Sequence, residues 1–317
     1  MAFTGKRILL GVSGGIAAYK AAEVARRLVS AGARVKVVMT QAAQEFVTPL
    51  TFQALTGEKV AAAMFGPGSE PLEHVALGQE VDALVLAPAT ANLIGKMAAG
   101  IGDDLLTTIL LAANKPILVC PAMNCEMWAN PVVQENVAKL RDRGLTVLQP
   151  EAGELACGAV GYGRLPEPET ILEALARLVS PQDLAGQRIL VTAGPTHEDM
   201  DPVRFLTNRS SGKQGYALAK VARRRGAEVC LISGPSQLST PQGVEMVEVR
   251  SAREMLDAVL ARFPRSEALL MAAAVGDYHP TSRSEHKMKR GSQELTVHLT
   301  QILISSKKWP GLRRSKW

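Results

Sequence analysis

The chain has 317 residues, 47% of them hydrophobic, and is long enough for two globular domains, while no apolar run reaches the length of a membrane span. Of its formal net charge of +6, the stretch 301–317 supplies five Lys or Arg residues and no acid, so the remainder is nearly neutral and shows no nucleic-acid-binding patch. The four cysteines lack disulfide or zinc spacing, and no signal peptide precedes the first strand pattern, which together favour a cytoplasmic location.

The first predicted element is a strand over Arg7–Val12, followed by Ser13-Gly14-Gly15 and a helical pattern through about Val29. Such a turn before a helix favours phosphate, because free N–H groups and the helix dipole point at it. The spacing is not Gly-X-Gly-X-X-Gly, and the next strand, Arg34–Met39, ends in Thr40, where a dinucleotide fold usually carries an acid. A mononucleotide site therefore fits better than an NAD site, and an ordinary turn without ligand remains the alternative.

The next segment contains His74 and a third predicted strand, Val81–Ala87. A single histidine is more often a surface or core residue than a functional one. The strand leads into a turn of small and polar residues, namely Pro88, Ala89, Thr90, Ala91 and Asn92. Asp103 and Asp104 then precede a helix, where stabilisation of the helix dipole is favoured over paired-carboxylate catalysis.

The most informative stretch is Pro121–Trp128, which follows an apolar strand over Ile117–Cys120. An open α/β sheet binds its ligands at the carboxyl ends of its strands. Asn124 offers amide donors and an acceptor to a polar substrate group, while Met123 and Trp128 offer apolar walls. The alternative is that this Met and Trp simply belong to the core.

A second informative stretch is Glu154–Leu165, in which glycines are concentrated around a single thiol, Cys157. The glycines predict a mobile loop that folds over a ligand rather than a strand or helix. A partly exposed thiol can donate a proton or act as nucleophile, although a lone cysteine in a loop is more often inert.

Together these two stretches resemble the substrate-binding motif and flexible lid of the flavin-dependent cysteine decarboxylases. Over about residues 5–300 the chain resembles the bifunctional bacterial coenzyme A biosynthesis proteins. The resemblance implies FMN as cofactor, trimer-based homo-oligomers, and oxidative decarboxylation of phosphopantothenoylcysteine to phosphopantetheine. It assigns acid–base work to His74, the substrate carboxylate to Asn124, a substrate contact to Met123 and the final proton donation to Cys157. The flavin contacts that it implies are Ser13, Gly14, Gly15, Thr40, Pro88, Ala89, Thr90, Ala91 and Asn92.

A linker over Pro181–Gly186 and a fresh strand, Arg188–Val191, indicate a second domain. The loop Asn208–Gly215 precedes a predicted helix over Tyr216–Arg225 and suggests phosphate binding without Walker spacing, and a plain turn is equally compatible. An apolar strand over Leu269–Val275 then leads into a polar turn and a basic loop.

In this half the resemblance implies CTP-dependent ligation of phosphopantothenate with cysteine, with Mg²⁺ neutralising the CTP phosphates. Asn208 would stabilise the acyl intermediate, and no residue is assigned as a metal ligand. The implied CTP contacts are Ala272, Ala273, Asp277 and Lys287. The predicted fold class is α/β, with two Rossmann-like three-layer domains: an FMN-binding decarboxylase domain over 1–182 and an incomplete nucleotide-binding ligase domain over 183–300.

The resemblance breaks after Thr300, where a basic tail over 301–317 replaces the family pattern. A reading-frame shift explains this break, and we expect an intact decarboxylase with absent or severely reduced ligase activity. Two alternatives stay open: a monofunctional decarboxylase with a remnant second domain, and a non-catalytic flavin-binding regulatory subunit. Cys157 and the stretch Pro121–Trp128 argue against a third, an FMN-binding prenyltransferase-type protein.

Overall fold

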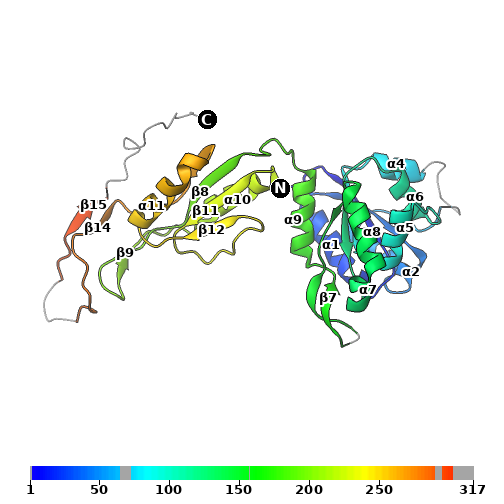
Figure 1. The fold of residues 1–317 in the computed structure, drawn as a ribbon, viewed down its shortest axis with the longest axis horizontal. Coiled ribbons are helices and arrows are strands. Elements are labelled where there is room, and N and C mark those ends of the chain that lie inside the picture. Colours follow the sequence, from blue (N-terminus) through cyan, green and yellow to red (C-terminus); the bar gives the residue numbers. More distant parts are fainter. Residues whose placement is uncertain (1, 65–72, 157, 290–294, 303–317) are drawn as a thin grey trace. The chain divides into compact units, whose positions relative to one another are not determined.

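A parallel five-stranded sheet forms the centre of the first of the two units, residues 1–180 and 181–317, into which the computed structural model divides (Figure 1). The structure describes residues 2–64, 73–156, 158–289 and 295–302. The strand order is β2-β1-β3-β4-β5. The chain therefore adds β2 on one side of β1 and then β3, β4 and β5 on the other side. The strands are β1 (Arg7–Val12), β2 (Arg34–Met39), β3 (Ala83–Ala89), β4 (Ile117–Pro121) and β5 (Thr146–Val147).

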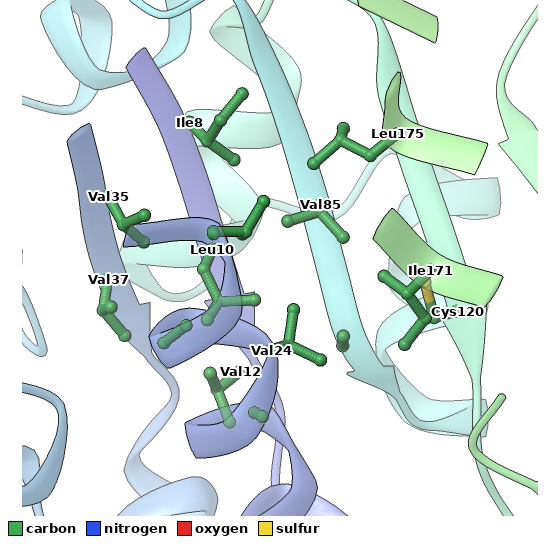
Figure 2. Packing of buried hydrophobic residues seen from close by; sticks show 14 of the residues in the cluster. Ile8, Leu10, Val12, Val24, Val35, Val37, Val85, Cys120, Ile171 and Leu175 are labelled. Atoms are coloured by element: carbon green, nitrogen blue, oxygen red, sulfur yellow. The ribbon is translucent and has the colours of Figure 1, made fainter. Parts of the chain in front are cut away.

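Helices cover both faces of this sheet, because successive side chains of a strand point to opposite sides. Ile8 and Leu10 of β1 pack in one cluster with α1, α3 and α9, part of which Figure 2 shows. Leu9, between them, packs in the other cluster with α5, α6 and α8. The helices are α1 (Ala18–Ser30), α2 (Gln41–Gln44), α3 (Pro49–Thr56), α4 (Glu73–Gln79), α5 (Ala91–Ala99), α6 (Leu105–Ala112), α7 (Cys125–Ala129), α8 (Pro131–Asp142) and α9 (Pro168–Val179).

The glycine-rich stretch 154–165 is largely a β-hairpin, so the prediction of a loop without strand structure is wrong. β6 (Glu151–Glu154) and β7 (Val160–Arg164) pair antiparallel. A Cβ atom at Gly163 would lie 2.2 Å from the carbonyl oxygen of Met123, and the Met123 N–H donates to the Gly163 carbonyl at 3.0 Å. Here glycine permits close packing of two segments.

Strand β3 extends two residues beyond its predicted end at Ala87. Ala89 pairs with Pro121 of β4, and the N–H of Ala122 donates to the Ala89 carbonyl at 3.0 Å. Pro88 and Ala89 therefore end the strand, and the turn itself begins at Thr90.

The second unit contains a parallel four-stranded sheet in the order β12-β11-β8-β13. Helix α10 (Lys213–Arg224) packs on one face and α11 (Ala252–Arg262) on the other. The strands of the unit are β8 (Arg188–Ala193), β9 (Glu198–Asp199), β10 (Phe205–Leu206), β11 (Glu228–Ser233), β12 (Glu245–Glu248), β13 (Ala268–Met271), β14 (Tyr278–Pro280) and β15 (Leu299–Gln301), with a short 3-10 helix at Phe263–Arg265. Both units thus place helices on both faces of a parallel sheet, which confirms the predicted three-layer α/β class.

Strand β13 ends at Met271, four residues before the predicted end at Val275. The regular ladder with β8 stops at the pair Met271–Thr192, one residue before β8 itself ends at Ala193. The chain nevertheless continues beside the turn after β8, because the N–H of Ala274 donates to the Gly194 carbonyl at 2.9 Å.

Helix α10 lies directly against β8. A Cβ atom at Gly215 would be 2.8 Å from the Thr192 carbonyl oxygen and 2.5 Å from the Ala193 Cβ. Only glycine permits this separation. Within the described residues, none of the helices has both the length and the apolar character needed to cross a membrane.

Candidate functional site

A pocket of about 1420 Å³ lies in the first unit, lined by the segments that follow β1, β2, β3 and β4. This is the carboxyl edge of the parallel sheet, where open α/β folds bind ligands. The volume exceeds the range of about 300–1,000 Å³ that is usual for a single small ligand. The pocket can therefore hold a cofactor and a substrate together.

Most of the residues predicted for the first domain meet in this pocket. Its lining includes Ser13, Gly14, Gly15, Thr40, Pro88, Thr90, Ala91, Asn92, Met123 and Asn124. Residues far apart in the sequence are brought together because parallel strands all end at the same edge of the sheet.

Ser13 connects the two turns at the centre of the pocket. Its buried hydroxyl donates to the Pro88 carbonyl at 2.8 Å and accepts from the Thr90 N–H at 3.0 Å. Thr90 in turn accepts from the Leu93 N–H at 3.4 Å and caps α5. One hydroxyl thus fixes the β1–α1 turn relative to the β3–α5 turn.

The N-terminus of α1 opens onto the pocket, since Gly15, Ile16 and Ala17 all line it. Among the described residues, no side chain caps this helix at Ala17. By contrast, Thr40 caps the short helix α2 by accepting from the Ala43 N–H at 3.2 Å. An uncapped helix start beside a glycine turn is a suitable place for an anion.

Asn124 is held by its own helix cap. Its side-chain oxygen accepts from the Glu126 N–H at 2.8 Å at the start of α7. A substrate carboxylate would therefore have to accept from its Nδ2 group. Met123 lines the pocket as predicted, but Trp128 does not. Trp128 is buried in the hydrophobic cluster that contains α5, α6 and α8, so its predicted role as a pocket wall is wrong.

Two predicted residues of the first domain are described but do not line this pocket, and a third lies outside the described residues. Ala89 is fully buried in β3, with its backbone paired to β4. His74 lies half-buried near the start of α4. Cys157 lies outside the described residues.

The structure also adds charged residues that the sequence analysis missed. Lys20 Nζ and Arg164 Nη2 lie 2.9 and 3.6 Å from the same Glu167 carboxylate oxygen, and both residues line the pocket. Lys96 also lines it, and the hydrogen bond from its ammonium to Asp103, at 2.7 Å, raises its pKa. Lys20 and Lys96 each lie in the helix that follows a predicted ligand-binding loop, one or two helical turns from its start. Projecting those helices from the sequence would have placed both lysines near the site.

Asp104 likewise lines the pocket, but its carboxylate serves α6. It accepts from the Thr107 N–H at 2.8 Å in a capping box. This agrees with the helix-terminus interpretation of the acidic pair.

The second unit has a smaller pocket, of about 660 Å³, near the ends of β11 and β12. It is lined by Ser210, Ser211 and Lys213 at the start of α10, which no described side chain caps at Gly212. His197 also lines it; burial and the charge of Arg250 lower the pKa of this imidazole.

The predicted ligase residues are not among those that line this pocket. Asn208 donates to the Ala274 carbonyl and accepts from the Ser210 N–H at 2.9 Å. It therefore joins the loop before α10 to the segment after β13, which contains the predicted Ala272 and Ala273. Asp277 and Lys287 are exposed.

Comparison with known proteins gives the same division of the chain. Residues 2–180 match the family described as Flavoprotein, and residues 184–303 match the family described as DNA/pantothenate metabolism flavoprotein C-terminal domain. The coenzyme A biosynthesis bifunctional protein CoaBC of Vibrio parahaemolyticus is 49% identical over 300 residues, covering 94% of this chain and 75% of that protein. The chain belongs to the CoaBC family.

The CoaBC protein of Mycobacterium bovis is 50% identical over 292 residues, covering 90% of this chain and 70% of that protein. Among solved structures, a PPC decarboxylase variant in complex with pantothenoylaminoethenethiol is 32% identical, with a TM-score of 0.48, and covers 54% of this chain and 96% of that one. Membership of the CoaBC family confirms the predicted resemblance.

Proposed function

We propose that this CoaBC-family chain acts in coenzyme A biosynthesis from phosphopantothenate. Residues 1–182 would carry the FMN-dependent decarboxylation of phosphopantothenoylcysteine to phosphopantetheine. Residues 183–300 would carry the CTP-dependent ligation of phosphopantothenate with cysteine. The observation that carries the proposal is the pocket at the carboxyl edge of the first sheet, in a chain that matches the Flavoprotein family over residues 2–180.

The pocket suits a flavin mononucleotide. Its volume of about 1420 Å³ leaves room for a substrate, and the uncapped start of α1 offers N–H groups to a phosphate. Ser13, Gly14, Gly15 and Thr40 would hold that phosphate, and Pro88, Thr90, Ala91 and Asn92 would contact the rest of the cofactor. FMN supplies the oxidation and reduction that allow an amino-acid carboxylate to leave as CO2.

The protein's own side chains would orient the substrate and move protons. The Nδ2 group of Asn124 would donate to the substrate carboxylate, while its Oδ1 stays bound to the start of α7. Met123 would cover an apolar part of the substrate. Cys157 would donate the final proton, and Cys157→Ser should then stop turnover before product forms.

His74 would take part in acid–base catalysis, but it does not line the pocket of its own chain. We therefore propose that a second copy supplies it, within a trimer-based homo-oligomer. Exposed apolar side chains near the pocket support such an assembly: Ile16, Tyr19, Phe46 and Leu50 are 50–71% exposed. Mixing inactive His74→Asn and Asn124→Asp chains should restore part of the activity if the two residues come from different copies.

In the second unit, CTP would bind beside α10, with contacts from Ala272, Ala273, Asp277 and Lys287. Asn208 would stabilise the acyl intermediate. Among the described residues there is no cluster of three or more His, Cys, Asp or Glu side chains suited to a metal. Mg²⁺ would accordingly enter with the CTP phosphates rather than in a cage of protein ligands.

The decarboxylase is tested with the purified chain and phosphopantothenoylcysteine. Bound FMN, released CO2 and phosphopantetheine are the expected results, with Asn124→Asp as the inactive control. Bound FMN without turnover would instead favour the non-catalytic regulatory alternative. The ligase is tested separately by CTP-dependent condensation of phosphopantothenate with cysteine. Robust condensation would refute the expected loss of ligase activity, and its absence would leave a decarboxylase alone.

A further inference from the structure

The carboxylate of Asp201 is buried in the turn between β9 and β10, with 1% of the residue exposed. Its Oδ1 accepts from the N–H groups of Val203 and Arg204, each at 2.7 Å. Its Oδ2 accepts from the N–H of Met288, at 3.1 Å, which lies 87 residues further along the chain. Burial raises the pKa of this carboxyl, but these N–H donors outweigh it, so the pKa lies below its usual value and the group is charged.

Arg204, in the same turn as Asp201, also binds the backbone of Met288. Its Nη2 donates to the Met288 carbonyl at 3.2 Å, and its Nη1 lies 3.9 Å from Asp201 Oδ2. Both backbone polar groups of Met288 are therefore bound by this Asp–Arg pair. A further hydrogen bond joins the two segments, from the Ser284 N–H to the Met200 carbonyl at 2.9 Å.

Met288 stands between Lys287 and Lys289, both of which are exposed. Exposed lysines on an irregular segment ordinarily sample many positions, because their flexible stems and loop backbone are not held. Here the backbone between them is fixed by a buried, charged acceptor. Hydrogen bonds to charged groups are stronger than neutral ones, so the arrangement is suited to hold this short segment in one place.

We propose that Asp201 and Arg204 are positioning residues that hold Lys287 for the phosphates or base of a nucleoside triphosphate. This inference rests on the proposed CTP site, because it assigns to the pair an effect on that site through Lys287. Neither residue needs to touch the nucleotide. Their contribution is to remove the entropy cost of ordering the loop when the ligand binds.

We call the bonds from Asp201 and Arg204 to the Met288 backbone the clamp. It is tested without any ligand, by limited trypsin cleavage of the native chain after Lys287. In Asp201→Asn the side-chain oxygen can keep the Val203 and Arg204 bonds, but an NH2 group then faces the Met288 N–H. We expect cleavage to become about tenfold faster, as the loss of one hydrogen bond to a charged group implies. Arg204→Lys, which loses the guanidinium that reaches both the Met288 carbonyl and the Asp201 carboxylate, should act in the same direction.

Glu198→Gln is the matched control. Glu198 is also a buried carboxylate of this hairpin, but it accepts from the Ala252 N–H, at 2.9 Å, at the start of α11. Its replacement removes the same charge without touching Met288, so cleavage after Lys287 should stay within twofold of the parent rate. Equal cleavage rates in Asp201→Asn and the parent would overturn the clamp.

Positioning for a nucleotide is tested by calorimetric titration of CTP with Mg²⁺ into the parent chain and both variants. We expect Asp201→Asn to bind CTP about tenfold more weakly and Glu198→Gln to bind as the parent does, even where the two lose similar thermal stability. Unchanged CTP affinity in Asp201→Asn would overturn the positioning role. A parent chain that binds no CTP would overturn the proposed CTP site and this role with it, whereas the trypsin comparison would still decide whether the clamp exists.

Discussion

Gly163→Ala tests whether the contact between β7 and the Met123–Asn124 segment shapes the first pocket. The new Cβ would start 2.2 Å from the Met123 carbonyl oxygen, a separation that has to grow to at least 3.0 Å. Such overpacking against backbone costs about 1–3 kcal/mol, because neither segment can rotate a side chain out of the way. It also strains the hydrogen bond from the Met123 N–H to the Gly163 carbonyl, whose N–O distance is 3.0 Å in the parent.

Met123 and Asn124 both line the pocket, so the same shift displaces the proposed substrate contacts by most of 1 Å. A misplacement of that size lowers catalysis by about 100-fold. We expect kcat/KM for phosphopantothenoylcysteine to fall by this factor, and Tm to fall by about 4–8 °C if the cost is about 2 kcal/mol. Bound FMN is quantified from its absorbance in the same samples, so that loss of the cofactor is distinguished from displacement of the substrate.

Gly95→Ala is the control, because a Cβ there meets only Asn136 Nδ2, at 3.9 Å. This change within α5 should stabilise the chain by about 0.5–1 kcal/mol and leave activity unchanged. Our explanation would be refuted if Gly163→Ala kept both the parent Tm and the parent kcat/KM.

Three further predictions follow from single side chains. Asn124→Asp keeps the oxygen that caps α7 but sets a carboxylate against the substrate carboxylate, so steady-state assays should show a decrease in kcat/KM of at least about 100-fold with the fold retained. Ser13→Ala leaves the Thr90 N–H without its acceptor, so thermal unfolding should show a loss of about 1–3 kcal/mol, and equilibrium dialysis should show weaker FMN binding. Burial lowers the pKa of His197 in the folded state, so the unfolded state binds more protons than the folded state as pH falls through about 6.5. Tm should therefore decrease as pH falls over that range, and His197→Gln should reduce the slope of Tm against pH. A slope that is the same in the variant would contradict the last prediction.

Much of the first unit could be predicted because its signals are local. Arg7–Val12 and Arg34–Met39 are strands with the predicted bounds, since each is a short apolar run ended by turn residues or a helix start. The convergence of Ser13, Thr40 and Thr90 also followed from the sequence, because parallel strands place the segments after them along one edge.

The rest depends on contacts that no local pattern contains. The glycines of β7 predicted a loop, yet Gly163 is needed because the Met123 carbonyl lies against it. β13 stops at Met271, opposite Thr192 of β8, although the apolar run continues to Val275. Trp128 follows a strand as a ligand-binding residue would, but the direction of α7 turns it into the core.

The close contact between Gly215 and β8 bears on how the second unit can move. At Gly215 no side chain separates the two backbones, so this end of α10 cannot slide across β8 without a collision. The start of α10 and the carboxyl end of β8 therefore behave as one rigid unit. Any closure around a ligand would therefore have to come from other segments that move toward a helix that stays still.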